Sequence, residues 1–351
     1  MAYNLDYTKT ADLLAAYKQE RKSVSFVKDR YFKDGIVFGT DEVLIEYKKG
    51  RRVLAPFVSS QINGKVMKRT EYSAKGFEPA MIQPKRVMSL DTLKRKGFGE
   101  AFYNQLTPAE RAVAIAVDDM NELRDMIELR KEQMACEVLQ TNALNMKYYT
   151  DNNDLMETKT IEFFDGVNPA IATITNKWNT AAADILADVK ALCIQLQHEG
   201  LPATEVLVGS DVAEVLTNNA KIQTLLDNRR YEMGKWEPEE LYPDVTLLGE
   251  LNCYGKKVKF IEYLGTYEDE KTGKDVDFID PKSIIVTAPD CGVTNYGAIT
   301  QIDYGQADYT TYAEKEVPLY EVKDQTRSII LKSAPLVQPK NLSPFRVAKV
   351  L

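Results

Sequence analysis

Histidine is almost absent from this sequence, which has a single one, His198, in 351 residues. A Ser-His-Asp or Cys-His nucleophile system would have to use this residue. It falls near the end of a predicted helix, where the helix dipole favours a histidine on the surface. We therefore expect no catalytic histidine and no conventional zinc, haem or copper site.

Cysteine is sparse too, and its spacing excludes two classes of protein. The four cysteines stand at positions 136, 193, 253 and 291, with no C-x-x-C pair. A disulfide framework and a structural zinc site both need more closely arranged cysteines. We expect reduced and mostly buried thiols, as in a cytosolic protein.

Nucleotide-binding glycine motifs and long apolar runs are absent from the sequence. VLVGSD (206–211) predicts a strand that enters a helix, but neither G-x-G-x-x-G nor G-x-x-x-x-G-K-[ST] occurs there. The longest purely apolar run, AVAIAV (112–117), is far shorter than the ~20 residues that span a membrane. The N-terminal stretch also lacks the basic-then-apolar pattern of a signal peptide. We predict that the protein is not an enzyme and has no catalytic, cofactor-binding or metal site, no cofactor and no membrane contact.

Charge is distributed unevenly along the chain. The net charge of −7 argues against a general nucleic-acid-binding protein. Residues 1–100 contain 20 Lys and Arg against 12 Asp and Glu, whereas the remainder contains 25 against 40. In an assembly of copies, a basic first third and an acidic remainder favour front-to-back contacts that salt weakens.

One long helix is the clearest element that the sequence predicts. It covers residues 107–144, with Thr107 as N-cap, Pro108 at the first helical position and Glu110 completing a capping box. Such a helix is roughly 50 Å long. Because sustained heptads are absent, we expect it to support a sheet as a spine rather than form a coiled coil. Its apolar stripe is predicted to contain Val113, Val117, Met120, Ile127, Met134 and Val138.

The chain before this helix predicts an arm. Residues 8–22 form a short amphipathic pattern with Leu13, Leu14 and Tyr17 on one face. Residues 25–42 carry irregularly spaced aromatic side chains, which predicts a segment that lies on another surface.

A long β-rich excursion follows over residues 41–90. KKGRR, INGK and SAKGFEPA are its candidate turns, and no long helix interrupts it. VLIEYKKGRRVLAPFVS (43–59) predicts a hairpin in which VLIEY and VLAPFVS flank the basic turn KKGRR. An excursion of this length is expected to have a function.

Residues 180–310 predict a compact α/β unit. We expect a helix over 179–200 that ends at Gly200, and a second helix capped by Asp211. The strands TEVLVG (204–209) and SIIVTAP (283–289) are apolar throughout, which is typical of strands covered on both faces. A β pair is expected to turn at Tyr254-Gly255, and the C-terminal tail to hold one strand, Ser328–Lys332, before proline-broken extended chain.

Several stretches along the chain are informative when taken together: YTKTADLLAA, RYF with FGTDEVLIEY, VLAPFVSSQINGKV, FEPAMIQPK before the long helix, and SAPLVQPKNLSPFRV near the end. In this order they resemble the lambda-type phage major capsid protein family. No single stretch is diagnostic, but together they cover nearly the whole chain in the family's order. The resemblance implies an α+β fold of the Hong Kong 97 capsid type and a structural protein without an active site.

The resemblance also implies a division of the chain. Residues 1–38 correspond to an N-terminal arm and residues 39–96 to an extended loop that reaches over a neighbouring subunit. Residues 97–178 and 312–351 correspond to a peripheral domain with a long spine helix. Residues 179–311 correspond to an axial domain around the hexamer or pentamer axis.

The function implied by the resemblance is assembly of the icosahedral shell of a tailed phage. The expected partners are other copies in hexamers and pentamers, a scaffolding protein, a portal, double-stranded DNA enclosed without sequence-specific binding, and in some relatives a decoration protein. Assembly in the host cytoplasm and a final place in the virion follow. Two alternatives stay open: a shell of the same fold that encloses enzymes, and a soluble α/β enzyme or ligand-binding protein built on residues 179–311.

Basic residues of the extended loop are the candidate contacts between subunits. A neighbour's acidic surface explains them at least as well as a phosphate backbone does. Some relatives cross-link a loop lysine to an asparagine of another subunit. Lys48, Lys49, Lys65 and Lys68 lie in the corresponding region, but the sequence locates no asparagine partner, and we do not expect this cross-link here. The candidate contact residues are Lys48, Lys49, Arg51, Arg52, Lys65, Lys68 and Arg69.

Overall fold

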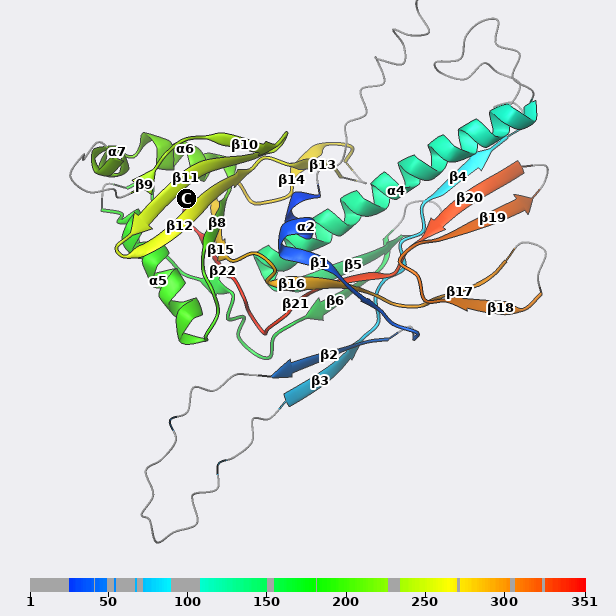
Figure 1. The fold of residues 1–351 in the computed structure, drawn as a ribbon, viewed down its shortest axis with the longest axis horizontal. Helices are drawn as coiled ribbons and strands as arrows, with labels where there is room; N and C mark the ends of the chain where they lie inside the picture. Colours follow the sequence, from blue (N-terminus) through cyan, green and yellow to red (C-terminus); the bar gives the residue numbers. More distant parts are fainter. Residues whose placement is uncertain are drawn as a thin grey trace, which may run out of the picture.

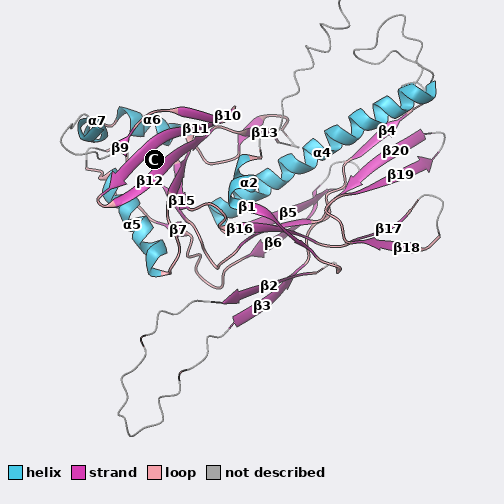
Figure 2. Ribbon diagram, in the orientation of Figure 1, coloured by secondary structure: helices cyan, strands magenta, loops and turns pink. Residues whose placement is uncertain are grey.

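The structure is a computed structural model that describes twelve parts of the chain. It is elongated, with one long helix running from a large sheet to a smaller one (Figure 1). Strands make up most of the other regular structure (Figure 2). The described residues are 25–40, 42–48, 54, 67, 72–89, 108–149, 155–180, 182–226, 234–269, 272–303, 307–323 and 326–351.

An eight-stranded sheet forms the broad end of the subunit. Its strand order is β10-β11-β12-β8-β15-β22-β7, and β9 pairs with β11 beside β10. The strands β8 and β12 are parallel, whereas β15 is antiparallel to β8 and to β22. The bounds are β7 Ile171–Ala172, β8 Glu205–Val208, β9 Gly234–Lys235, β10 Glu239–Tyr242, β11 Val245–Cys253, β12 Lys256–Tyr263, β15 Ser283–Thr287 and β22 Arg346–Lys349.

Both faces of this sheet are covered, which explains its continuous apolar strands. Alternate side chains enter different cores: Val206 and Val208 pack with α5 (Ile185–His198) and α6 (Ser210–Asn218), whereas Leu207 packs in the core that contains the long helix. The helix α7 (Ala220–Leu226) adds Ile222 to the first core. The predicted buried strands of 204–209 and 283–289 are confirmed.

The long helix α4 (Pro108–Thr141) confirms the predicted spine. Its C-terminal half packs in the core beneath the eight-stranded sheet, and Leu123 and Ile127 pack against a three-stranded sheet of order β19-β20-β4. Within the predicted apolar stripe, Val117 is wrong, because it is 54% exposed, and the side chain of Val113 lies outside the described part of the chain. The bounds are β4 Lys85–Met88, β19 Val317–Lys323 and β20 Thr326–Lys332.

The segment before the excursion is part of the subunit body. The helix α2 (Phe26–Tyr31) packs on α4, and β1 (Phe32–Val37) pairs in parallel with β16 (Gly292–Tyr296), which also pairs with β21 (Pro335–Pro339). The aromatic side chains expected to lie on another surface, Phe26, Tyr31 and Phe32, are buried in this chain's own core. The sequence does not show this because the partners are more than 100 residues away.

The start of the excursion pairs differently from the predicted hairpin. The strand β2 (Val43–Lys48) is antiparallel to β3 (Tyr72–Phe77), with Val43 opposite Phe77 and Lys48 opposite Tyr72. Apart from Leu54, the stretch VLAPFVS lies outside the described residues. Within the described residues, the partner of VLIEY is a strand that begins 24 residues after the end of β2, and the local pattern of two apolar runs around a basic turn did not indicate this pairing.

Two-stranded ribbons complete the described fold. The strands β5 and β6 follow α4 directly, β13 and β14 lie beside it on the other side in Figure 1, and β17 and β18 project near the narrow end. The tail contains two further buried strands, β21 and β22, where extended chain was expected. The bounds are β5 Ala143–Tyr149, β6 Leu155–Glu162, β13 Thr266–Glu268, β14 Asp275–Asp277, β17 Ile299–Ile302 and β18 Tyr309–Tyr312.

Local signals for turns and helix ends were mostly accurate. Gly200 follows α5 with φ +83°, as expected of a glycine that stops a helix, and Tyr254 and Gly255 both have positive φ in the turn between β11 and β12. Asp211 lies in the first turn of α6, not at its cap, which is Gly209. The predicted helix over residues 8–22 and the cap at Thr107 lie outside the described residues.

Candidate functional site

Of the predicted contact residues, only the backbone of Lys48 lies within the described structure. Figure 1 shows β2 and β3 projecting away from both sheets and from α4. Lys48 is the last residue of β2. Its side chain and the residues Lys49, Arg51, Arg52, Lys65, Lys68 and Arg69 lie outside the described part of the chain.

A network of buried and partly buried polar side chains lies at the junction of α2 with α4. Ser25, the N-cap of α2, makes no side-chain cap. The carboxylate of Glu132 on α4 takes that role, accepting the backbone N–H of Val27 and of Lys28 at 2.8 Å each. Orphan amides at a helix start need such an acceptor, so the start of α2 is fixed by a residue 105 positions away.

Glu132 is completely buried, and its hydrogen-bond partners among the described residues include no cationic side chain. The hydroxyl of Tyr263 donates a third hydrogen bond to it at 2.9 Å. Burial raises the pKa of Glu132 to about 7, although the two amides and the hydroxyl act in the opposite direction. The three donors suit an ionised carboxylate, and the desolvated surroundings suit a neutral one.

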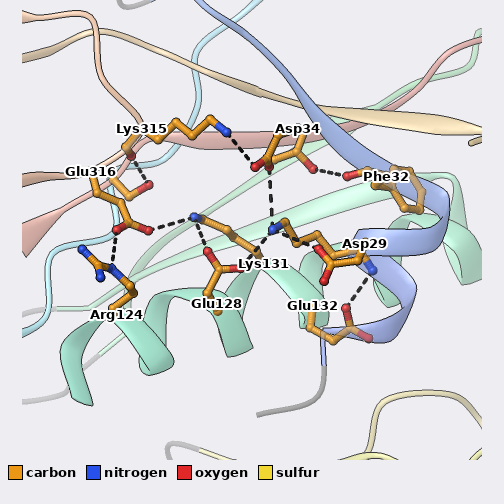
Figure 3. A network of polar contacts seen from close by, with 12 residues as sticks. Asp29, Phe32, Asp34, Arg124, Glu128, Lys131, Glu132, Lys315 and Glu316 are labelled. Carbon is orange, nitrogen blue, oxygen red and sulfur yellow. Dashed lines mark hydrogen bonds and ion pairs between the residues drawn. The ribbon is translucent and has the colours of Figure 1, made fainter. Parts of the chain in front are cut away.

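A chain of ion pairs runs beside this cap (Figure 3). The side chain of Lys131 is 1% exposed, and its ammonium lies 2.9 Å from Glu128 and 3.2 Å from Glu316. Arg124 lies 3.0 Å from the same Glu316. Lys28 lies 3.0 Å from the other oxygen of Glu128. Burial opposes ionisation of Glu128, but the two lysines lower its pKa overall.

The same chain of charges reaches β1. Asp34 accepts from Lys315 at 2.7 Å and from the hydroxyl of Tyr296 at 2.8 Å. Lys131 also lies over the ring of Tyr296, 5.1 Å from its centroid. These contacts join four parts of the sequence, residues 26–37, 124–132, 296 and 315–316, in one network.

A second pair ties α2 to the eight-stranded sheet. Glu205 at the start of β8 accepts from Arg30 Nε at 2.8 Å, from a second nitrogen of that guanidinium, and from the Tyr31 hydroxyl at 2.7 Å. Burial raises the pKa of Tyr31, and the adjacent carboxylate adds to this effect. The short segment 26–31 is therefore attached to the spine helix on one side and to the sheet on the other.

The chemistry of these groups is structural. Burial raises the pKa of Cys193 to about 11 and of Cys253 and Cys291 to about 12, so all three are weak nucleophiles. All four cysteines are buried and free, as predicted, and His198 is exposed at the end of α5. Within the described residues, no group of three His, Cys, Asp or Glu side chains can hold a metal ion, and no helix is long and apolar enough to cross a membrane.

Sequence reasoning did not find this network. Glu128 and Lys131 are spaced three residues apart on a helix, which is an ordinary surface pattern. Lys131 is buried and Glu128 partly buried beside Glu316 and Lys28, their ion-pair partners, which the fold brings from distant parts of the chain. No local signal in the sequence identifies these contacts.

The arrangement of spine helix, covered sheet and projecting ribbon is that of a phage capsid protein of the Hong Kong 97 type. The crystal structure of a prophage capsid protein from E. coli CFT073 covers 99% of this chain and 99% of its own, with a TM-score of 0.63 and 16% identity. This likeness establishes the fold and confirms the predicted α+β class.

The chain belongs to the phage major capsid protein E family, whose profile matches residues 9–350. It is 22% identical to the major capsid protein of Escherichia phage lambda over 93% of this chain and 94% of that one. The major capsid protein of Enterobacteria phage P21 is 24% identical, and the match spans 44% of each chain, less than half the length of that relative. The names of these relatives describe a structural protein of the phage head, in agreement with the prediction of a non-enzyme.

Proposed function

We propose that this protein is the major capsid protein of a tailed phage and that its copies assemble into the icosahedral shell around a double-stranded DNA genome. The observation that carries the proposal is the family match over residues 9–350. The structural match to a prophage capsid protein, which covers 99% of this chain, supports it.

Projecting ribbons give physical support for assembly. A two-stranded ribbon alone is only marginally stable in water. The ribbon β2–β3 leaves the body, and β17–β18 exposes Tyr309 to 76% and Ile302 to 43%. A neighbouring copy that covers these elements buries their apolar surface, and closed symmetry multiplies each modest contact.

The proposed partners follow the family resemblance. Copies form hexamers and pentamers, a scaffolding protein and a portal participate in assembly, and DNA is enclosed without sequence-specific binding. A decoration protein is a further possible partner of the mature shell. Assembly takes place in the host cytoplasm, and the finished protein resides in the virion.

The proposed division keeps the arm, loop, peripheral and axial parts, with one change in the tail. Residues 312–339 return to the spine helix, consistent with β19 and β20 beside α4. We assign β22 to the axial part, because it pairs with β15 in the eight-stranded sheet. Residues 26–37 connect the arm to both parts through the network around Glu132 and Glu205.

Electron microscopy of purified protein, with and without a scaffolding protein, tests the function directly. We expect rings or closed shells, and DNA-filled shells containing this protein in phage particles. Persistent monomers under all conditions would count against the proposal. Particles filled with packaged protein instead of DNA would favour the enzyme-enclosing shell.

A further inference from the structure

A groove runs along the side of α4 that faces away from α2. Its volume is about 710 Å³, within the ~300–1,000 Å³ typical of binding clefts. It lies between the ribbon β5–β6 on one side and β13–β14 on the other. Its apolar lining comes from Met126, Leu129, Tyr267, Val276 and Phe278.

The charged lining of the groove is acidic. Five carboxylates line it against two cations, which leaves an excess of three negative charges. An apolar surface with a negative border suits a segment that has an apolar face and flanking cations. The carboxylates belong to Glu137, Glu268, Asp269, Asp277 and Asp280, and the cations to Arg130 and Lys147.

The 24 residues that precede Ser25 join the described part of the chain close to this groove. The first described residue is Ser25, and the ring centroids of Phe26 and Tyr263 lie 6.2 Å apart. Tyr263 lies 6.0 Å from Phe278, a residue of the groove wall. The preceding 24 residues reach up to ~80 Å when extended, and a helix over 8–22 takes only ~22 Å.

The sequence of that segment matches the groove. Leu13, Leu14 and Tyr17 lie on one face of the predicted helix, at the spacing used by helices that bind in apolar grooves. Residues 8–22 also carry four cations against two carboxylates. The segment is thus complementary to the groove in both apolar surface and charge.

We propose that residues 8–22 bind in this groove of the same subunit as an amphipathic helix, with Leu13, Leu14 and Tyr17 against its apolar lining. In this arrangement the groove holds the N-terminal segment against the spine helix of the same subunit. This inference goes beyond the shell function and concerns the dispersed subunit, so microscopy of shells and the following test can fail independently.

Photo-cross-linking of the full-length dispersed protein tests the proposal. Tyr17→p-benzoylphenylalanine places an aromatic photoprobe on the apolar face with little change of shape. We expect cross-links to peptides that contain Met126 or residues 266–278, several-fold above those from the control Tyr309→p-benzoylphenylalanine, whose position on β18 is 76% exposed. Cross-links elsewhere, or no excess over the control, would overturn the proposal.

Mixing light and heavy-isotope protein distinguishes the two sources of the segment. Cross-links only within one isotope support binding within the same subunit, whereas light–heavy pairs show a second copy in the groove and overturn the proposal. Asp277→Lys should lower the groove cross-links several-fold at low salt. The matched control Asp275→Lys, on the same strand but not lining the groove, should not, and unchanged cross-linking in Asp277→Lys would contradict the charge match.

Discussion

Glu132 shows how much of this fold depends on single buried side chains. Its carboxylate satisfies two backbone amides of α2 and one tyrosine hydroxyl. Buried donors without partners cost about 1–3 kcal/mol each, so the position is more important than an exposed glutamate. A helix of six residues such as α2 is not stable by itself, and its attachment to α4 supplies what its sequence does not.

Glu132→Ala should lower the free energy of unfolding by about 2–4 kcal/mol, because it removes a cap and leaves donors unpaired in the core. Urea denaturation followed by circular dichroism measures the change. The matched control is Glu122→Ala on the same helix, where the glutamate side chain is 53% exposed and paired with Arg86. The control should cost less than about 1 kcal/mol. Equal losses in both variants would show that the cap of α2 by Glu132 adds no more stability than an exposed ion pair does.

The same residue predicts a dependence on pH. The pKa of Glu132 in the folded protein is raised from 4.5 to about 7, so the folded state holds this proton more tightly than the unfolded state does. Its contribution to stability is complete below pH 4.5 and is lost as the pH rises through 7. The difference in melting temperature between wild type and Glu132→Gln should therefore shift against wild type between pH 5.5 and 8. Parallel melting curves across this range would contradict the raised pKa.

At the scale of elements, the hydrophobic character of a residue on the spine helix does not decide whether it is buried. Met120 packs against the cluster of Leu123, Ile127, Ile329 and Leu331, whereas Val117 is 54% exposed. The sequence placed both on one stripe because both are apolar. Only the position of β20 beside α4 decides which of them is covered.

Met120→Asp should destabilise the protein by about 2–4 kcal/mol, as expected for an unpaired charge in a partly buried site. Thermal unfolding measures the loss. Val117→Asp is the matched control on the same helix and should change stability by less than about 0.5 kcal/mol. If the two variants have the same melting temperature, the helix faces are assigned wrongly.

Prediction of elements succeeded where the pattern was local. Helix α4 began at Pro108 as the proline-first pattern indicated, and the turn at Tyr254-Gly255 adopts the expected positive φ angles. It missed the partner of β2, which is β3, and it missed the strands β21 and β22, because the prolines of the tail predicted extended chain without further strands. The partner of a strand depends on which distant strands the fold brings beside it, so a local pattern does not specify the partner.

At the scale of the whole molecule, the uneven charge gives a prediction about assembly. Residues 48–69 carry seven cations and no carboxylate, in a chain whose remainder is acidic. Attraction between copies through such a segment weakens as salt shortens the screening length to roughly 8–10 Å near physiological ionic strength.

Arg51→Glu with Arg52→Glu should leave the melting temperature of the monomer unchanged but lower the yield of shells, with the larger loss at low salt. Sedimentation of assembly reactions at two salt concentrations measures the yield. Lys274→Glu with Lys323→Glu is the control, since it changes the net charge equally at exposed positions outside the predicted contact set. Normal shell yield from the arginine variant would show that these charges make no contact.

The sequence by itself determined the local elements and the order in which they follow one another. Caps, glycines with positive φ and apolar periodicity act over a few residues, so they can be read without the fold. The ordered resemblance to phage capsid proteins was visible there as well. The tertiary structure decided which surfaces are covered: it brought Glu132 to the start of α2, Glu205 to Arg30 and β22 into the eight-stranded sheet. These pairings join residues far apart in the chain, and their energies depend on burial, which only the packed molecule defines.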